Sequence, residues 1–301
     1  MSAQQRAALP ELARVFLRLG STAFGGPAAH TALLHQELVV QRQWLSEEQF
    51  LDLVSAANLI PGPNSTELVI HIGLQRAGYA GMLVAGLCFI APAMFSVLAL
   101  AAAYVRFGSL PAALALLAGV NEVGLLLPAV VAASALPFAL PVLFLVFLKI
   151  GAVLYGSGYV LLAFLRADLV VRLGWITERQ LLDAVAAGQL TPGPLFTSAT
   201  FIGYLLGGLP GAMLVTLGIF LPAFIFVLFT QPLLARLRSM HGAAGLLAGV
   251  NAASLGLLAA VAGQLAWGLA GDPVGALLGV AALLLLVRTR ISASWLLLGG
   301  A

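Results

Sequence analysis

The sequence predicts an all-α polytopic membrane protein made of two inverted-topology repeats, and three observations lead to this fold class. The 301 residues are 61% hydrophobic and 8% charged, with a mean hydropathy of +1.07, whereas a soluble domain carries roughly 25% charged residues. Several apolar runs are long enough to cross about 30 Å of hydrocarbon as helices. Finally, the motif Pro-Gly-Pro occurs twice, at residues 61–63 and 192–194, inside matching surroundings.

Charge and cysteine content narrow the classes of protein further. The formal charge is +3, and the Arg residues lie scattered between apolar runs, as expected of residues that orient a protein in the lipid bilayer. A nucleic-acid partner is therefore not expected. The single Cys88 allows no disulfide within the chain, and residues 1–10 are polar and lack the hydrophobic core of a cleaved signal.

The apolar runs give seven predicted spans. They are residues 12–32, 81–104, 112–135, 138–165, 211–229, 243–269 and 274–287. Glycines interrupt the first span and the fourth. The runs beside each Pro-Gly-Pro differ, because arms of about ten to thirteen residues are too short to cross alone. We expect each motif to break a re-entrant hairpin or a pair of half-helices.

The second half of the chain repeats the first. Trp44 to Gln49 matches Trp175 to Gln180, and the three glycines at 73, 78 and 81 match those at 203, 208 and 211. The offset is 131 residues early and 130 after the hairpin, which predicts two repeats over residues 12–146 and 147–301. If the hairpin is re-entrant, each repeat has an odd number of crossings and the halves are inverted. A single broken span would make them parallel, and we favour inversion.

Each Pro-Gly-Pro is followed by the start of a new helix with small polar residues beside it. The backbone N–H groups at a helix start are unpaired and attract anions. The substrate-binding residues predicted at the two motifs are Gly62, Asn64, Ser65, Thr66, Gly193, Thr197 and Ser198. Inversion would place both loops near the membrane midplane, facing each other.

Two carboxylates, Glu67 and Glu122, lie within apolar segments. A carboxylate in hydrocarbon is costly and tends to be kept neutral or paired, which suits a proton carrier. Glu67 precedes His71 by four residues, so both side chains share a helix face and we predict that they couple proton movement. Alternatively, Glu67 stabilises the helix start through the helix dipole.

Cations and glycines also occupy matching places in the repeats. Arg18 and Lys149 are predicted to bind or attract the anion, although Arg18 could equally extend to the membrane surface. The glycines that interrupt the first span of each repeat, among them Gly25, Gly26 and Gly156, either expose backbone N–H groups to the substrate or allow close helix packing.

Other chemistry finds little support in the sequence. His30 and His35 are expected near a membrane face, and with His241 they lack the spacing of metal ligands. Motifs of hydrolases, metalloproteases and nucleotide-binding proteins are missing, so we expect neither an enzyme nor a cofactor. An intramembrane enzyme or assembly factor would need a convergent set of reactive groups that the sequence does not offer.

Three motifs together resemble the chromate ion transporter (CHR) family over nearly the whole chain. They are Phe24-Gly-Gly-Pro27, then Pro61-Gly-Pro-Asn-Ser-Thr-Glu67 with His71-Ile-Gly73, and Thr191-Pro-Gly-Pro194 with Ile202-Gly-Tyr204. The resemblance implies a two-repeat protein of the bacterial inner membrane that exports chromate with the proton gradient and confers chromate resistance. Its partners would be chromate or a related oxyanion, and protons. Transport or uniport of sulfate or another small anion is the alternative, and a homodimer stays open.

Overall fold

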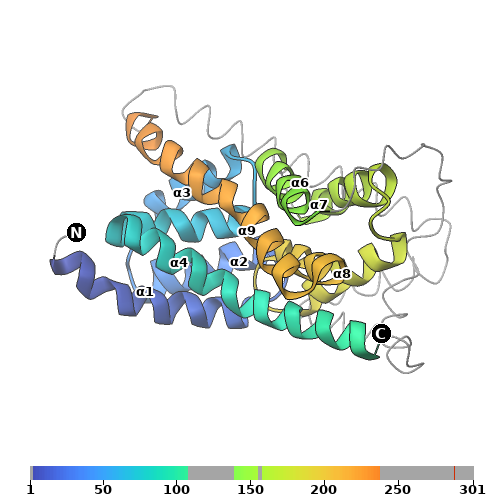
Figure 1. Cartoon of the computed structure of the whole chain (residues 1–301). Coiled ribbons are helices and arrows are strands. Elements are labelled where there is room, and N and C mark those ends of the chain that lie inside the picture. The colour runs from blue at the N-terminus through green and yellow to red at the C-terminus, as the bar shows by residue number, and fades with distance from the viewer. Residues whose placement is uncertain (1–2, 108–138, 155–157, 238–287, 289–301) are drawn as a thin grey trace.

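A computed structural model describes residues 3–107, 139–154, 158–237 and residue 288 (Figure 1). Within these residues all regular secondary structure is helical, which confirms the all-α part of the predicted class. The first repeat contains α1 (Ala3–Thr22), α2 (Gly26–His35), the π-helical turn η1 (Gln36–Gln41), α3 (Glu47–Leu59) and α4 (Asn64–Phe107). The second contains α6 (Leu140–Val153), α7 (Gly158–Leu165), the π-helical turn η2 (Arg166–Arg172), α8 (Glu178–Leu190), the 3₁₀ turn η3 (Leu195–Thr197) and α9 (Ser198–Leu237).

The same elements follow one another in both halves. The predicted boundary between residues 146 and 147 falls inside α6. The predicted spans 112–135, 243–269 and 274–287, like Glu122, lie outside the described residues.

The helices before each Pro-Gly-Pro begin and end for local reasons. Ser46 caps α3 and Thr177 caps α8, each in a capping box with the glutamine three residues later. Both helices are 13 residues long. Each is followed by a residue in an extended conformation, as expected just before proline.

Both α4 and α9 consist of a short arm and a long arm. The backbone leaves helical geometry at Ala77 and Gly78 in α4 and at Gly207 and Gly208 in α9, with closely similar dihedral angles. At each break the chain turns back, so that the backbones of Gly73 and Gly81 touch. A Cβ atom on either glycine would overlap the carbonyl oxygen of the other. The short arms are residues 64–77 and 198–207, and the long arms are 79–107 and 209–237.

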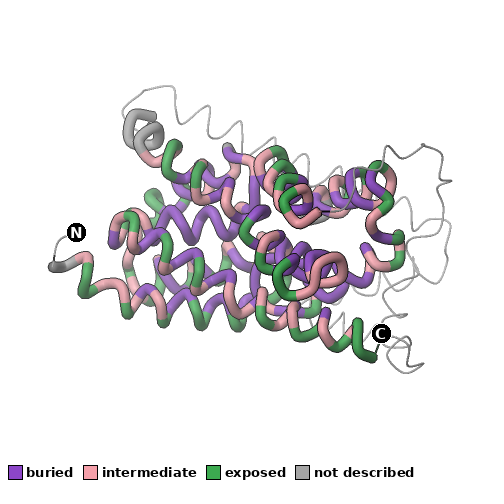
Figure 2. The backbone as a smooth tube through the Cα atoms, in the orientation of Figure 1, coloured by how far each residue is buried: buried purple, intermediate pink, exposed green. Residues whose placement is uncertain are grey.

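Within each repeat the first helix packs against the long arm through a glycine. A Cβ atom at Gly20 of α1 would overlap the carbonyl oxygen of Phe89, and one at Gly151 of α6 would overlap that of Ile219. Small residues allow such close backbone approach between membrane helices. The buried residues gather in the middle of the molecule, where the helices of both repeats meet (Figure 2).

The two repeats meet through reciprocal contacts of their Pro-Gly-Pro loops. The Gly62 N–H donates to the Leu154 carbonyl at 2.8 Å, and the Gly193 N–H donates to the Ala23 carbonyl at 2.8 Å. Gly62 corresponds to Gly193, and Ala23 corresponds to Leu154, both at the offset of 131. Each repeat therefore donates to the other the same hydrogen bond that it accepts from it, as expected of two units related by a two-fold axis.

A second set of contacts joins the far half of each long arm to the other repeat. The Tyr104 hydroxyl donates to Asp183 of α8 at 2.8 Å, and His71 on the short arm of α4 lies 3.2 Å from the Gln231 side-chain oxygen of α9. Figure 1 shows the two long arms running in opposite directions.

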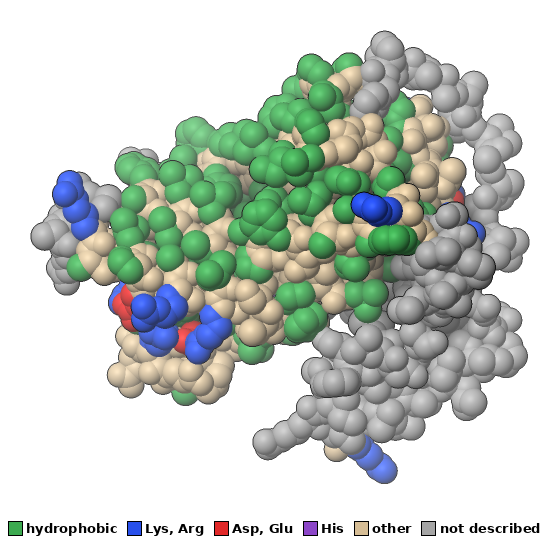
Figure 3. Space-filling view, turned by 60° about the horizontal axis from the view of Figure 1, so that its bottom comes forward, with side chains coloured by type: hydrophobic (Ala, Val, Ile, Leu, Met, Phe, Trp, Pro, Cys, Tyr) green, Lys and Arg blue, Asp and Glu red, His purple; other side chains and the backbone are tan. Residues whose placement is uncertain are grey.

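The outer surface carries many large apolar side chains, at matching places in the two repeats. Leu83 and Met213 are each 49% exposed, and Leu87 and Leu217 are exposed in the same way. Hydrophobic side chains cover most of the face in Figure 3, where the largest group of charged side chains lies at one edge. Among the described residues, two helical stretches, α4 and 195–231, are long and apolar enough to cross a membrane. Such a surface suits lipid better than water.

The backbone contact between the two arms of α4, and the same contact in α9, lead to a stability prediction. Replacing Gly81 or Gly211 by Val places a branched side chain against a carbonyl oxygen that cannot move aside. We expect the unfolding temperature of the detergent-solubilised protein to fall by about 5–10 °C, since overpacking typically costs 1–3 kcal/mol.

The matched controls are Leu83→Val and Met213→Val, which change exposed side chains two residues further along the same helices. These variants should melt close to the original protein. Equal melting of the glycine variants and the controls would contradict the close contact.

Candidate functional site

A small pocket lies between the two Pro-Gly-Pro loops. The first loop contributes Pro63, Asn64 and Ser65, the second contributes Pro194, Leu195 and Phe196, and α2 adds Pro27 and His30. Both loops predicted to hold the substrate thus line one pocket. It has room for roughly one water molecule. A tetrahedral oxyanion is larger, so the loops must separate before it can enter.

The polar groups of this pocket come from the first repeat alone. Where the first loop has Asn64 and Ser65, the second has Leu195 and Phe196, and the position that corresponds to His30 is Leu161. The scaffold is therefore two-fold symmetric, whereas the chemistry of the pocket is not.

His30 is buried inside the protein, which the sequence did not predict. Its side chain is only 2% exposed, and it connects three elements. Nδ1 lies 3.1 Å from the Ser65 hydroxyl, Nε2 lies 3.0 Å from the Ala23 carbonyl oxygen, and the ring meets Phe89 edge-on. His35 is more exposed and pairs with Glu47. The two histidines lie only five residues apart on α2, but their surroundings are very different.

Several predicted donors are engaged elsewhere in this structure. The N–H groups of Gly62 and Gly193 form the contacts between repeats. The hydroxyl of Thr197 donates to the Pro194 carbonyl and that of Ser198 to the Leu195 carbonyl, both at 2.8 Å. These side chains hold their own loop in shape and do not line the pocket.

The glycines near α2 lie just outside the pocket. Gly25 and Gly26 both have positive φ angles, 101° and 78°, so they make the left-handed turn from α1 into α2. Pro27, which follows them, lines the pocket instead. Gly156 lies outside the described residues.

Glu67 is completely buried, and neither of its carboxylate oxygens has a hydrogen-bond partner among the described residues. The carboxylate lies against Gly62, where a Cβ atom would overlap Oε1. The Thr66 hydroxyl, next to it in sequence, is equally buried and unpartnered within the described part of the chain. An ionised carboxylate without a partner is very costly in such a place, so this site favours a neutral acid.

His71 is also fully buried, one turn further along the short arm. It faces α9, where the Gln231 side-chain oxygen accepts a hydrogen bond from Nδ1 at 3.2 Å and the Thr230 hydroxyl lies 3.4 Å from Nε2. The described contacts contain no hydrogen bond between His71 and Glu67. The two predicted proton carriers thus face different neighbours in this arrangement.

Both predicted anion-binding cations are paired with carboxylates. Arg18 contacts Glu37 of η1, and Lys149 lies 3.0 Å from Asp168 of η2. The side chains of Arg18 and Lys149 are 55% and 50% exposed, whereas both carboxylates are nearly buried. Neither cation lines the pocket. Each ion pair ties the first helix of a repeat to the π-helical turn.

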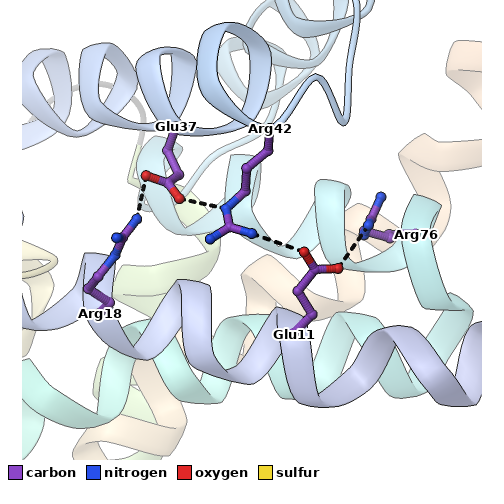
Figure 4. Close-up of polar contacts among 5 residues, drawn as sticks. All are labelled: Glu11, Arg18, Glu37, Arg42 and Arg76. Carbon is purple, nitrogen blue, oxygen red and sulfur yellow. Dashed lines mark hydrogen bonds and ion pairs between the residues drawn. The ribbon is translucent and has the colours of Figure 1, made fainter.

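The first repeat extends this pairing into a network (Figure 4). Arg42 donates to Glu37 at 2.6 Å and to Glu11 at 2.9 Å, and Arg76 donates to Glu11 at 3.0 Å. Arg76 also stacks over Trp44, with 3.9 Å between its guanidinium and the ring centroid. The network fixes α1, η1 and the turn end of α4 to one another.

Some of these residues could have been found in the sequence. Glu37 and Asp168 match at the same offset of 131 as Arg18 and Lys149, so the repeat itself offered both ion pairs. The sequence signal at His30 is a difference between the repeats, because this polar residue corresponds to the apolar Leu161. Among the described residues, no cluster of His, Cys, Asp and Glu side chains could hold a metal ion.

Comparison with known proteins now adds the family. The profile described as "Chromate transporter" matches residues 10–142 and again residues 141–301. The chain belongs to the chromate transporter family. The double match confirms the resemblance and the presence of two repeats, and it identifies a membrane protein of a transporter family.

Relatives match the chain over most of their length. The chain is 28% identical to a chromate transport protein of Cupriavidus metallidurans, over 97% of this chain and 91% of the relative. It is 30% identical to a chromate transport protein of Pseudomonas aeruginosa, over 85% of this chain and 81% of the relative. A third relative, an uncharacterized transporter of Methanocaldococcus jannaschii, is 24% identical over 82% of the chain. No solved structure matches.

The loop contacts of the site lead to a prediction of rescue. A Cβ atom at Gly193 would lie 2.7 Å from the Cβ of Ala93, and the glycine has a φ angle of 97°. Gly193→Ala should therefore lower the unfolding temperature of the purified protein by about 5 °C or more.

Adding Ala93→Gly removes the atom that the new methyl group meets. We expect the double variant to regain part of the lost stability, leaving the cost of the backbone strain. If Ala93→Gly instead lowers the stability of the Gly193→Ala variant by the full cost of a glycine in a helix, about 1 kcal/mol, the contact with residue 93 is not what destabilises Gly193→Ala.

Proposed function

We propose that the protein is a secondary transporter that exports chromate, or a related tetrahedral oxyanion, across the bacterial inner membrane and thereby confers chromate resistance. The proton gradient and the membrane potential drive the export. One observation carries the proposal: two Pro-Gly-Pro loops from the two repeats line a single pocket at the starts of α4 and α9. The names of the relatives supply the substrate class.

The pocket offers what a tetrahedral dianion needs. Helix starts present unpaired N–H groups and positive dipole ends, and Asn64, Ser65 and Thr66 add side-chain donors once the loops separate. Gly62, Gly193, Thr197 and Ser198 join the substrate shell when the contacts between repeats open. The site carries no fixed net charge of its own, so the anion can also leave.

Contacts with the long arms support a site at the membrane midplane. Residues 79–107 extend about 43 Å at 1.5 Å per residue, more than the roughly 30 Å of hydrocarbon. A Cβ atom added to Gly193 would overlap that of Ala93, halfway along this arm, and one added to Gly62 would lie 3.9 Å from that of Ala223, halfway along the other. Re-entrant hairpins that start at opposite membrane surfaces would meet there.

The contacts at the arm ends support inverted repeats. The first long arm starts at Gly78 and, near its end, Tyr104 contacts Asp183 in the hairpin of the second repeat. The second long arm starts at Gly208 and, near its end, Gln231 contacts His71 in the hairpin of the first. Each arm therefore ends on the side where the other hairpin begins, which is the antiparallel arrangement of inverted-repeat transporters.

Inversion predicts opposite labelling of two matched positions. On a Cys88→Ala background, Glu48→Cys and Arg179→Cys place a thiol in the exposed first turn of α3 and of α8. An impermeant maleimide should label one of the two in intact cells and both after permeabilisation. Labelling of both thiols from the same side would establish parallel repeats.

The two cations and the glycines before the second helix of each repeat act outside the pocket, on the path of the anion. Arg18 and Lys149 attract the dianion from solvent, exchanging their carboxylate partners for it as it passes. Gly25, Gly26 and Gly156 supply backbone N–H groups along the path. The half-exposed state of both cations supports this role.

Glu67 and His71 couple transport to protons. Glu67 is buried without a described partner, as expected of a group that holds a proton until a conformational change exposes it. His71 touches the second repeat through Gln231, so it senses the relative position of the repeats. Movement between repeats would bring a proton from one group to the other.

Glu67→Gln tests this coupling. The neutral side chain has the same shape as the protonated acid, so the protein should fold normally, whereas chromate flux driven by a pH gradient should fall at least tenfold in proteoliposomes. Glu47→Gln, at an exposed carboxylate, is the matched control and should keep its flux. Normal coupled flux in Glu67→Gln would remove Glu67 from the mechanism.

Chromate flux with excess sulfate as competitor tests the substrate itself. Gradient-dependent chromate flux that sulfate hardly affects indicates a chromate carrier. Suppression by sulfate would favour the alternative, a transporter or uniporter of sulfate or another small anion in the same fold. Flux of neither ion would contradict the proposed function.

A further inference from the structure

The hydrogen bonds of His30 fix which of its ring nitrogens carries the proton. The Ala23 carbonyl oxygen can only accept, so His30 Nε2 must donate to it. In the neutral ring Nδ1 then has a lone pair, and it accepts a hydrogen bond from the Ser65 hydroxyl at 3.1 Å. The single hydroxyl proton of Ser65 is thereby directed at His30.

This arrangement leaves the pocket poorly prepared for an anion. Ser65 lines the pocket, but with its proton engaged it presents oxygen lone pairs there. Asn64 donates one of the two N–H groups of its side-chain amide to Asn58 Oδ1 at 2.7 Å. The two polar side chains of the first loop therefore both have a hydrogen-bond donor turned to a protein partner.

We propose that His30 takes up one proton when the oxyanion binds, and that this proton turns the Ser65 hydroxyl toward the anion. In the imidazolium both nitrogens donate, Nε2 still to Ala23 and Nδ1 now to Ser65. Ser65 accepts this bond with a lone pair, and its own proton becomes free to donate into the pocket. The inference rests on the proposed function, because it assigns a positioning residue to the same anion site.

The surroundings of His30 explain why the proton and the anion bind together. The ring is buried against Phe89 and Pro27 and between the two loops, where a lone positive charge is costly. No acidic side chain lines the pocket in the described part of the chain. A dianion in the pocket supplies the missing opposite charge, and the imidazolium in turn offsets the burial of the anion.

Other titratable groups near this site face elsewhere. Glu67 and His71, on the same short arm as Ser65, point at Gly62 and at Gln231. From α1 only the Ala23 carbonyl reaches the ring, and the second loop offers Pro194, Leu195 and Phe196. Since Leu161 replaces the histidine in the second repeat, the pocket holds one such switch and the linkage involves one proton.

The test measures sulfate binding to the purified protein in nanodiscs by calorimetry at pH 6, 7 and 8. Sulfate stays a dianion over this range, so the ligand itself does not titrate. We expect affinity to rise as pH falls, by at most about tenfold per unit for one linked proton. His30→Gln should lose this pH dependence, because the amide can keep both hydrogen bonds of the neutral ring but takes up no proton.

Two further variants make the outcome specific. His35→Gln changes the partly exposed histidine five residues further along α2, which does not line the pocket, and should keep the original pH dependence. Ser65→Ala leaves the ring intact but removes the switched hydroxyl, so its loss of affinity should be large at pH 6 and small at pH 8.

An unchanged pH dependence in His30→Gln, or an equal loss at every pH in Ser65→Ala, would overturn the switch while leaving the transporter in place. If the original protein binds neither sulfate nor chromate at any pH, the proposed function fails instead. Should His30→Gln fail to fold, Ser65→Ala alone decides.

Discussion

The two hydrogen bonds from the Pro-Gly-Pro loops to the opposite repeat are the interaction on which the rest of the structure depends. The loop N–H groups at Gly62 and Gly193 lie in a buried, proline-rich stretch with no helical partner, and a buried donor must be paired. The carbonyls that accept them follow the last turn of α1 and α6, where the carbonyls also lack helical partners. One bond thus satisfies a loop and a helix end together, and it joins the repeats at the pocket.

A symmetric scaffold with an asymmetric pocket follows from this geometry. Backbone contacts at glycines depend on shape alone, so both repeats must keep them, as they do at Gly20 and Gly151. The side chains of both Pro-Gly-Pro loops line one small pocket, so polar side chains from one repeat are enough to make it polar. The second loop can therefore use Leu195 and Phe196, whose apolar side chains lower the local polarity and so strengthen the polar contacts made by the first.

Sequence patterns were sufficient for the helical class, the repeat and the breaks at Pro-Gly-Pro, because each depends on residues close together in the chain or on a fixed offset. The patterns also predicted Asn64 and Ser65 at the substrate site, and both residues line the pocket. They could not show that Gly62 donates to Leu154 or that Arg18 faces Glu37, since periodicity gives the face of a helix but not the neighbour it meets. Nor could they show that His30 is buried, because its helix is short and its neighbours Ala23, Ser65 and Phe89 come from other segments.

The contacts around the pocket differ greatly in how easily they separate. The first helices and long arms touch backbone to backbone, so they move only as a unit. Between the loops and the other repeat, by contrast, the described backbone hydrogen bonds are one from Gly62 to Leu154 and one from Gly193 to Ala23, each worth about 0.5–1.5 kcal/mol net. Apolar packing between α4 and α9 joins the repeats elsewhere. Under the proposed function, separation of the repeats would break equivalent contacts of both loops and leave the backbone contacts within each repeat intact, as alternating access between two repeats would require.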